Sequence, residues 1–177
     1  IKPVLIGCKK NLELVYKILI ANGEKLIANP TDLDIEDIPF EEDFTVGKPT
    51  AKTGEASFKW LTKATELVLK GYAKALVTAP IAKHAWHKAG YIYSGQTERL
   101  GELSGNTNPS MLFTALSPKS NFRLITLLAT THIPLKEVNK NLTPEKITSK
   151  LNELLAFCQK YKFNPKLAIA GLNPHAG

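Results

Sequence analysis

Apolar segments of two different periodicities alternate along this chain, and that alternation restricts the fold more than any other feature. Short continuous apolar runs, typical of buried strands, are followed by longer stretches with apolar residues at helical spacing. A succession of strand, helix and strand favours a sheet with helices packed through right-handed crossovers. We therefore predict a mixed α/β fold over residues 1–177, and we assign no internal domain boundary from the sequence.

Helices are expected where apolar stripes have recognisable start or stop residues. The expected helices cover residues 11–22, 54–70 and 144–161. Gly71 should end the second, since glycine is favoured just past a helix. Thr143 and Pro144 should open the third, as a hydroxyl cap followed by a first-turn proline. A further helix is expected to begin at Pro80.

Strands are expected at the short apolar runs. These runs are residues 4–7, 75–78, 111–116, 123–129 and 167–172. The third and fourth are joined by a turn-like segment and could form an antiparallel insertion. Residues 29–52 are rich in proline and acidic side chains, and we expect a long connection with one short strand there.

The formal charge is +7, from 23 Lys and Arg against 16 Asp and Glu. Such an excess is also found in nucleic-acid-binding proteins. Here the lysines are spread along the chain without a dense run, and aromatic residues do not interleave with them in a stacking pattern. We therefore expect a lysine-rich surface that binds no nucleic acid.

The cysteines and apolar runs indicate the cellular compartment of the protein, and the two ends indicate that the sequence is partial. No apolar run approaches the length of a bilayer span, so no membrane association is expected. Cys8 and Cys158 are far apart and form no CxxC motif, which predicts packing roles and a cytoplasmic location. The chain opens on Ile1 without an initiating Met and stops at Gly177, so we expect sequence missing on both sides.

Two of the four histidines follow apolar strand-like runs. His132 and His175 are both placed where the carboxyl end of a strand would lead into a loop. In open α/β sheets ligand-binding loops gather at these ends, so the two imidazoles could share one metal ion. Catalytic divalent sites commonly have three protein ligands, so the pair would be an incomplete set. A structural, hydrogen-bonded role is the alternative.

Other local signals are weaker. His84 and His87 have a spacing that could place them on one helix face, but lysines flank both, and we interpret them as surface residues. No G-x-G-x-x-G or Walker-type phosphate loop is present. The residues alone therefore indicate an α/β enzyme domain with a possible metal site.

Four segments resemble, in order, motifs of the 4-hydroxythreonine-4-phosphate dehydrogenase family. Residues 77–83 (VTAPIAK) are similar to its T-G-P-x-x-K element, and residues 94–98 (SGQTE) to its G-H-T-E. Residues 128–135 (LATTHIPL) resemble A-T-T-H-x-P-L, and residues 171–177 (GLNPHAG) are identical to G-L-N-P-H-A-G. Four ordered motifs are far more specific than one. The resemblance covers residues 4–177 and is strongest after residue 74.

The resemblance implies a fold like that of isocitrate and isopropylmalate dehydrogenases, in a partial chain. Such enzymes bind NAD or NADP without the usual glycine fingerprint. It also implies a homodimer with the active site at the subunit interface. His132 and His175 would each ligate a divalent metal, with a third histidine outside this chain. Histidine ligands favour zinc, with magnesium, manganese or cobalt as alternatives.

The resemblance further implies that Gln96 and Thr97 bind the substrate and that Lys83 lies near it. Gln96 departs from the family pattern, which has His there; an amide can donate and accept hydrogen bonds but cannot become cationic near pH 7. An alternative role for Thr97 is a helix cap ahead of Glu98. Lys83 could instead cap a surface turn.

The activity implied is NAD(P)-dependent and metal-dependent oxidation of 4-phosphooxy-L-threonine in vitamin B6 biosynthesis. The product, 2-amino-3-oxo-4-phosphooxybutanoate, would lose carbon dioxide to give 3-amino-2-oxopropyl phosphate. One alternative is a related dehydrogenase acting on phospho-threonate or phospho-erythronate, since Gln96 leaves the substrate open. A more distant one is a basic binding module for nucleic acid or metal without catalysis, whose nucleic-acid binding would be salt-sensitive.

Overall fold

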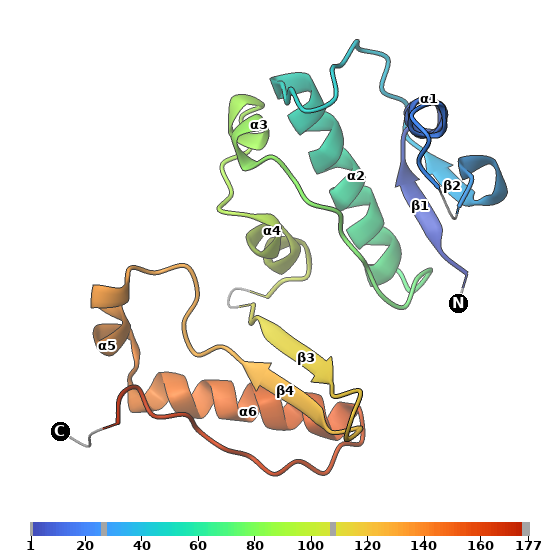
Figure 1. Ribbon diagram of the computed structural model, residues 1–177. Helices are drawn as coiled ribbons and strands as arrows, with labels where there is room; N and C mark the ends of the chain where they lie inside the picture. Colours follow the sequence, from blue (N-terminus) through green and yellow to red (C-terminus); the bar gives the residue numbers. More distant parts are fainter. Residues whose placement is uncertain (1, 26–27, 107–108, 175–177) are drawn as a thin grey trace. The chain divides into compact units, whose positions relative to one another are not determined.

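The computed structural model describes residues 2–25, 28–106 and 109–174. The chain forms two compact units, an N-terminal unit (Ile1–Pro109) and a C-terminal unit (Ser110–Gly177), which are coloured blue to green and yellow to red in Figure 1. Each unit combines helices with one two-stranded sheet. The predicted mixed α/β class is therefore confirmed.

The N-terminal unit is arranged around one long helix. Its elements are β1 (Val4–Gly7), α1 (Lys9–Ala21), the 3-10 turn η1 (Pro30–Asp32), β2 (Asp34–Asp37), α2 (Ala51–Leu69), α3 (Lys83–Lys88) and α4 (Gln96–Leu103). Strands β1 and β2 pair in parallel, with Val4 opposite Asp34. Helix α2 contacts β1, α3 and α4, and Figure 1 shows it between the strand pair and the two short helices. The short strand expected within residues 29–52 is confirmed as β2.

Helix α2 begins earlier than the apolar stripe predicted, because two threonines cap it reciprocally. The Thr50 hydroxyl accepts from the Thr53 backbone N–H at 3.2 Å, and the Thr53 hydroxyl accepts from the Thr50 N–H at 2.8 Å. A Thr–Thr pair satisfies the same free N–H groups as a capping box. Gly71, with φ of +80°, follows the helix as predicted.

The core of the N-terminal unit is aromatic. Phe58 and Leu61 of α2 pack with Trp86 of α3, which is completely buried. The Phe58 and Trp86 rings meet edge to face at 5.2 Å, and the Trp86 indole N–H donates to the Ser57 hydroxyl at 2.9 Å. Both the apolar surface and the polar atom of Trp86 are thereby accommodated.

Helices α2 and α3 approach so closely at one point that only glycine fits. A β-carbon at Gly54 would lie 2.2 Å from the Ala85 carbonyl oxygen, well inside van der Waals contact. Gly54 is buried within the first turn of α2. The backbone of α3 therefore rests directly on α2, and this contact helps to place Lys83 at the start of α3.

The C-terminal unit consists of a hairpin and a long helix. Its elements are β3 (Leu112–Leu116), β4 (Arg123–Leu127), the 3-10 turn η2 (Leu135–Glu137), α5 (Val138–Asn141) and α6 (Pro144–Lys160). Strands β3 and β4 pair antiparallel, as predicted. Helix α6 lies beside the hairpin in Figure 1. The Thr143 hydroxyl accepts from the Lys146 N–H at 3.3 Å, which confirms the predicted cap.

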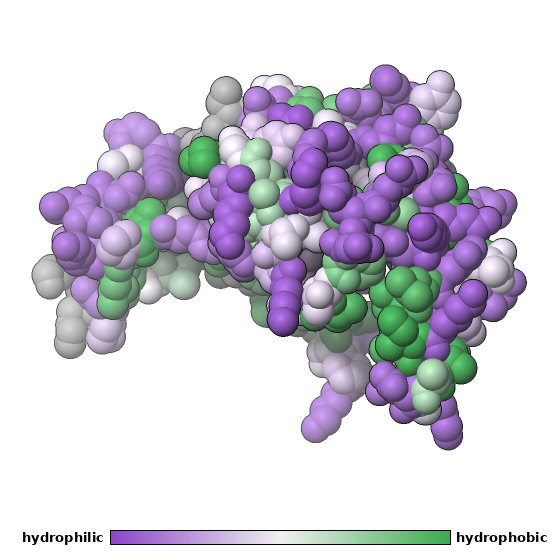
Figure 2. Space-filling model, turned by 90° about the horizontal axis from the view of Figure 1, so that it is seen from above, coloured by the Kyte–Doolittle hydropathy of each residue, from purple (hydrophilic) through white to green (hydrophobic). Residues whose placement is uncertain are grey.

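Two predicted strands and one predicted helix start are wrong. Residues 75–78 and 167–172 form no strand, and within the described ranges no other segment pairs with them. Their apolar side chains are largely exposed, with Val77 at 93% and Ile169 at 65%; Figure 2 shows apolar residues reaching the surface among hydrophilic ones. A strand requires a hydrogen-bonding neighbour, which an apolar run cannot reveal. Helix α3 begins at Lys83 rather than at Pro80.

Two further observations concern the compartment predictions. Cys8 and Cys158 are both buried free thiols, so their predicted packing roles are confirmed. No helix within residues 2–25, 28–106 or 109–174 has both the length and the apolarity needed to cross a membrane.

Candidate active site

The N-terminus of α4 brings two of the family-like motifs into contact. Gln96 is the first residue of α4, and its side-chain amide N–H donates to the Ala79 carbonyl oxygen at 2.9 Å. This bond joins segment 94–98 to segment 77–83 across a long separation in sequence. It also fixes the amide orientation, because the opposite orientation would set two oxygens against each other.

The other end of the Gln96 amide is a buried acceptor without a partner. Its Oε1 atom is shielded from water and accepts no hydrogen bond from any described residue. A buried polar atom in this state is costly unless another group satisfies it. The Gln96 Oε1 is therefore a hydrogen-bond acceptor that the described residues leave unused.

Thr97 does not cap α4. It is the second residue of that helix, whereas the N-cap position is Gly95, which supplies no side chain. The alternative prediction of a capping role is therefore wrong. Thr97 is a half-buried residue next to Gln96, and no hydrogen bond of its hydroxyl is found within the described residues.

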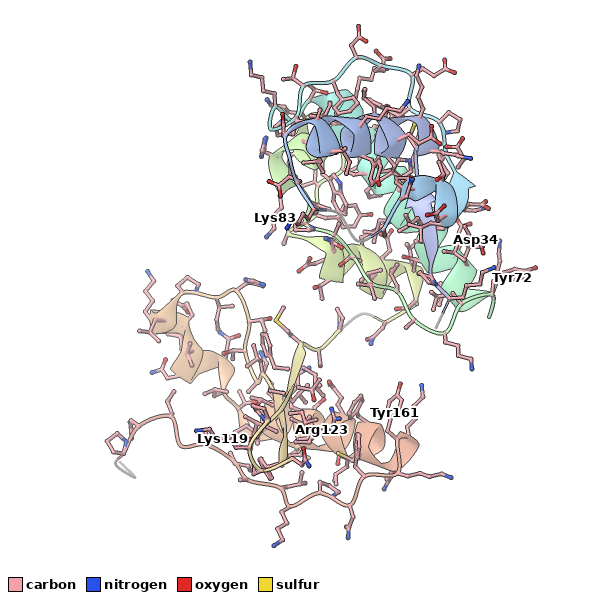
Figure 3. All side chains as sticks on the ribbon, turned by 45° about the vertical axis from the view of Figure 1, so that its right-hand side comes forward. Asp34, Tyr72, Lys83, Lys119, Arg123 and Tyr161 are labelled. Carbon is pink, nitrogen blue, oxygen red and sulfur yellow. The ribbon has the colours of Figure 1, made fainter. Side chains whose placement is uncertain are left out.

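Lys83 approaches the same helix start from α3. A β-carbon on Gly95 would lie 3.7 Å from the Lys83 Nζ and 3.4 Å from the Glu98 Oε2. An ammonium and a carboxylate therefore flank the glycine that precedes Gln96. Lys83, labelled in Figure 3, is itself exposed, so its charge is accessible to a ligand. The structure thus groups the three predicted substrate residues at one place.

The predicted metal residues lie in the C-terminal unit. His132 is exposed, and its imidazole makes no hydrogen bond or ion pair within the described part of the chain. Its φ is +55°, a backbone region that is uncommon outside glycine and found disproportionately at functional sites. His175 lies outside the described residues. The described ranges contain no group of three residues that could hold a metal.

The other two histidines are confirmed as surface residues. His84 and His87 are both exposed on α3. His87 has a structural partner, since its Nε2 lies 2.9 Å from the Tyr93 carbonyl oxygen. This contact links α3 to the segment that leads into α4.

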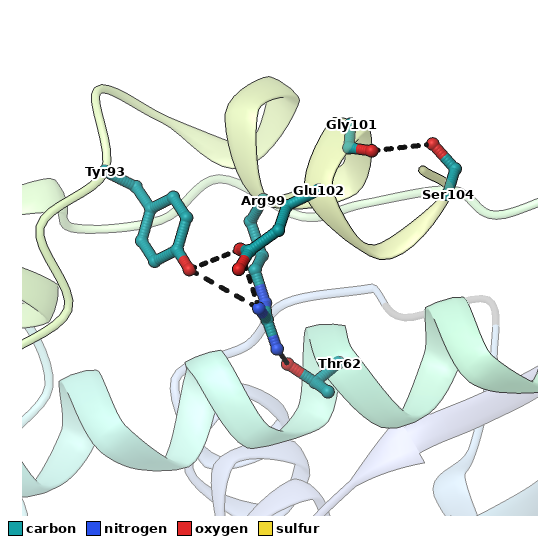
Figure 4. Close-up of polar contacts among 6 residues, drawn as sticks. All are labelled: Thr62, Tyr93, Arg99, Gly101, Glu102 and Ser104. Atoms are coloured by element: carbon teal, nitrogen blue, oxygen red, sulfur yellow. Dashed lines mark hydrogen bonds and ion pairs between the residues drawn. The ribbon is translucent and has the colours of Figure 1, made fainter. Parts of the chain in front are cut away.

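A polar cluster that sequence reasoning missed lies behind the α4 start (Figure 4). The Arg99 guanidinium donates to the Glu102 carboxylate at 2.8 Å and to the Thr62 hydroxyl of α2 at 3.2 Å. The Tyr93 hydroxyl donates to the same Glu102 carboxylate at 2.5 Å. The i,i+3 spacing of Arg99 and Glu102 could have predicted their ion pair from the sequence. The contacts of Tyr93 and Thr62 with this pair depend on the tertiary fold.

The charges of this cluster shift its titrations in opposite directions. The hydrogen bond to the Glu102 carboxylate, followed by burial, raises the pKa of the Tyr93 phenol. The hydrogen bonds from Tyr93 and then from Arg99 hold the pKa of Glu102 below its usual value. Near neutral pH the cluster therefore contains an anionic Glu102 and a neutral Tyr93.

A second missed cluster lies in the C-terminal unit. The nearly buried Lys150 ammonium donates to the Ser110 hydroxyl at 2.5 Å and to the Glu153 carboxylate at 3.1 Å, and Ser110 also donates to Glu153. Burial raises the pKa of Glu153, but the hydrogen bonds from Ser110 and Lys150 outweigh it and hold that pKa below its usual value. This cluster ties the start of the hairpin to α6.

Comparison with known proteins gives consistent matches along the whole chain. The family model described as "Pyridoxal phosphate biosynthetic protein PdxA" matches residues 1–177. The 4-hydroxythreonine-4-phosphate dehydrogenase of Synechococcus sp. (strain RCC307) is 52% identical over 177 residues, which cover 100% of this chain and 54% of that protein. The protein of the same name from Synechocystis sp. (strain ATCC 27184 / PCC 6803 / Kazusa) is 44% identical, over 97% of this chain and 51% of its own length.

Solved structures agree. The 4-hydroxythreonine-4-phosphate dehydrogenase from Klebsiella pneumoniae superposes with a TM-score of 0.78 at 28% identity, over 98% of this chain and 54% of that chain. The enzyme of the same name from Burkholderia phymatum gives a TM-score of 0.73 at 28% identity, over 99% of this chain and 55% of that chain. The chain spans about half the length of the curated relatives it matches.

Proposed function

Because the chain belongs to the PdxA family, we propose that the protein containing it is a 4-hydroxythreonine-4-phosphate dehydrogenase of vitamin B6 biosynthesis. The reaction is the NAD(P)-dependent oxidation of 4-phosphooxy-L-threonine to 2-amino-3-oxo-4-phosphooxybutanoate, which decarboxylates to 3-amino-2-oxopropyl phosphate. The observation that carries this proposal is the hydrogen bond from Gln96 to Ala79, because it unites two motifs of the family at one helix start.

We assign substrate binding to the α4 start. Gln96 Oε1, buried and without a partner among the described residues, accepts a hydrogen bond from a hydroxyl or ammonium group of the substrate. The Thr97 hydroxyl lies beside it on the same helix. The exposed Lys83 ammonium attracts the phosphate or carboxylate of the substrate, both of which are anionic at neutral pH. Each side chain binds or orients the substrate without itself reacting.

We assign the metal to His132 and His175, with a third histidine supplied from outside this chain. His132 supports this assignment because its imidazole is exposed and has no partner within the described residues. A divalent ion, zinc by the preference of imidazole ligands or else magnesium, manganese or cobalt, supplies a Lewis acid that stabilises negative charge on the substrate hydroxyl. His175 completes the part of the ligand set that belongs to this chain.

The fold we propose for the whole protein is like that of isocitrate and isopropylmalate dehydrogenases. The four ordered motifs shared with the family support it, and such enzymes bind NAD or NADP without the glycine fingerprint. The nicotinamide supplies the hydride acceptor. We also propose a cytoplasmic homodimer with the active site at the subunit interface, free of nucleic acid and membrane.

The test is a direct assay of the full-length protein that contains this chain. With 4-phosphooxy-L-threonine and NAD+ or NADP+, we expect reduced nicotinamide to form, and its absorbance follows the reaction. A chelator should stop the reaction, and zinc or magnesium should restore it. Formation of reduced nicotinamide that is indifferent to the chelator would contradict the metal assignment.

The same assay with phospho-threonate or phospho-erythronate as substrate tests the alternative function, a related sugar-acid dehydrogenase, that Gln96 supports. The Gln96 acceptor can bond an ammonium or a hydroxyl equally well, and phospho-threonate carries a hydroxyl where phosphooxy-threonine carries the amine. Turnover of phospho-threonate or phospho-erythronate alone would assign the protein to the related sugar-acid dehydrogenases. Salt-sensitive nucleic-acid binding without any turnover would favour the binding module instead.

A further inference from the structure

The candidate substrate residues lie within a polar cluster along the sequence. This cluster, here called the Arg99 cluster, consists of Tyr93, Arg99, Glu102 and Thr62. Tyr93 precedes Gln96, whereas Arg99 and Glu102 follow it on α4. Tyr93 and Arg99 meet at Glu102, at 2.5 Å and 2.8 Å. The short segment that carries Gln96 and Thr97 is therefore closed by side-chain contacts at both of its ends.

The same cluster attaches this segment to the core. Arg99 donates to the Thr62 hydroxyl of α2 at 3.2 Å, and its guanidinium lies 4.6 Å above the centre of the Phe58 ring. The Arg99 side chain is only 14% exposed. A guanidinium that is stacked on an aromatic ring and bonded to a carboxylate has few alternative positions. Arg99 thus holds α4 in one position on α2.

We propose that Arg99, with Glu102 and Tyr93 as its partners, is a positioning residue that holds Gln96 and Thr97 in the geometry needed to bind the substrate. This inference rests on the proposed function of Gln96 and Thr97. It assigns no contact with substrate to Arg99 itself. It predicts that loss of the cluster impairs substrate binding although every substrate-contacting side chain is intact.

The composition of the Arg99 cluster indicates that it positions the start of α4 rather than only stabilising the fold. The Arg99 Nε atom is buried and donates to no described residue, so the guanidinium is not fully satisfied. Buried charged groups of this kind are often replaced by apolar residues without loss of stability, whereas they can specify one arrangement. Here the specified arrangement is the angle at which the first turn of α4 faces the Ala79 carbonyl.

Two tyrosines of the same core provide a matched pair for the test. Tyr93→Phe removes the hydroxyl that bonds Glu102. Tyr91→Phe removes the same atom from a ring stacked on Phe58 at 3.7 Å, where the hydroxyl makes no hydrogen bond within the described residues. Arg99→Lys is the stronger variant, because lysine keeps the charge but loses the forked geometry.

The first readout needs no substrate. Amide hydrogen exchange of the full-length protein should be roughly two- to tenfold faster across residues 99–103 of α4 in Tyr93→Phe than in the wild type, the range expected for one lost hydrogen bond. Tyr91→Phe should exchange as the wild type does. Equal exchange in all three proteins would overturn the proposal.

The second readout separates positioning from global stability. In the assay with 4-phosphooxy-L-threonine, Tyr93→Phe and Arg99→Lys should raise KM by about two- to tenfold or more, with kcat changed less. Variants with a lower melting temperature but an unchanged KM would show a merely structural role and overturn the proposal. A wild-type protein that does not turn over this substrate would refute the proposed function, while the exchange readout would still decide the role of Arg99.

Discussion

The two units of the chain differ in how they bury their side chains. In the N-terminal unit, Phe58, Leu61 and Trp86 form an apolar core with aromatic contacts on all sides. In the C-terminal unit the buried side chains among the described residues are the apolar Cys158 and the charged Lys150. Phe113 and Leu124 of the hairpin are more than half exposed.

This difference separates two kinds of candidate site. Gln96 and Thr97 lie on a helix that polar contacts attach to the packed core, so the candidate substrate site is held by the N-terminal unit itself. His132 is exposed on a segment where its own φ is positive. Its side chain is therefore not held in place by burial in a core.

The largest expected effect, on turnover, is tested by substituting one exposed histidine in each unit with alanine. His132→Ala should reduce turnover of the full-length protein by at least about a hundredfold, since a catalytic metal contributes several kcal/mol of transition-state stabilisation. His84→Ala, the control in α3, should leave turnover unchanged. The assay is formation of reduced nicotinamide alongside metal content. A similar loss in both variants would break the distinction between the two units.

Core substitutions test whether the packing really differs. Phe58→Ala should lower the free energy of unfolding by about 3–5 kcal/mol, the usual range for a buried phenylalanine. Phe157→Ala, which removes a half-buried ring of α6 that contacts Tyr161, should cost roughly 1–2 kcal/mol because less area leaves water. Urea unfolding measures both. Equal losses would mean that the C-terminal unit is packed as firmly as the N-terminal one.

A charged group supports the C-terminal unit, in which Cys158 is the buried apolar side chain among the described residues. Lys150→Met should lower the free energy of unfolding by about 1–3 kcal/mol, because Glu153 and Ser110 lose a hydrogen-bonded partner. Lys140→Met offers the control, since Lys140 pairs with Glu137 at the surface with 73% of its side chain exposed, and surface pairs contribute little. If Lys150→Met also has no effect, the cluster is not a support of this unit.

The smallest effect is a pH dependence in the N-terminal unit. The folded pKa of Glu102 is below its ordinary value, so the bonds from Tyr93 and Arg99 stabilise the fold fully above about pH 5. That contribution is lost as the pH falls below the unfolded-state pKa and through the lower folded one. Glu102→Gln should therefore weaken the acid dependence of the melting temperature between about pH 5 and pH 3. An identical acid dependence in both proteins would exclude this role for Glu102.

Local features of the chain were predictable from sequence, whereas pairings between distant segments were not. The cap at Thr143 and the stop at Gly71 depend on neighbouring residues, and the structure confirms both. Residues 75–78 and 167–172 have strand-like composition, but strand formation depends on a partner that composition cannot name. Helix α3 likewise begins later than Pro80 suggested.

The candidate site divides in the same way. Gln96, Thr97 and Lys83 could be named from motifs, and the structure brings them together at the start of α4. The partnership of Tyr93 with Arg99 required the tertiary fold, because it depends on how α4 rests on α2. The joint role of His132 and His175 as metal ligands stays a prediction.

The close approach of helices at Gly54 has a consequence for engineering this enzyme family. A single methyl group at that position would displace the Ala85 carbonyl, and with it the short helix that begins at Lys83. Substitution there would move the Lys83 ammonium, the charge proposed to attract an anionic substrate, although Lys83, Gln96 and Thr97 would all keep their side chains. Mutant libraries intended to broaden the substrate range should therefore keep glycine at position 54. In variants there, a change in substrate recognition could not be separated from a displacement of the helix that begins at Lys83.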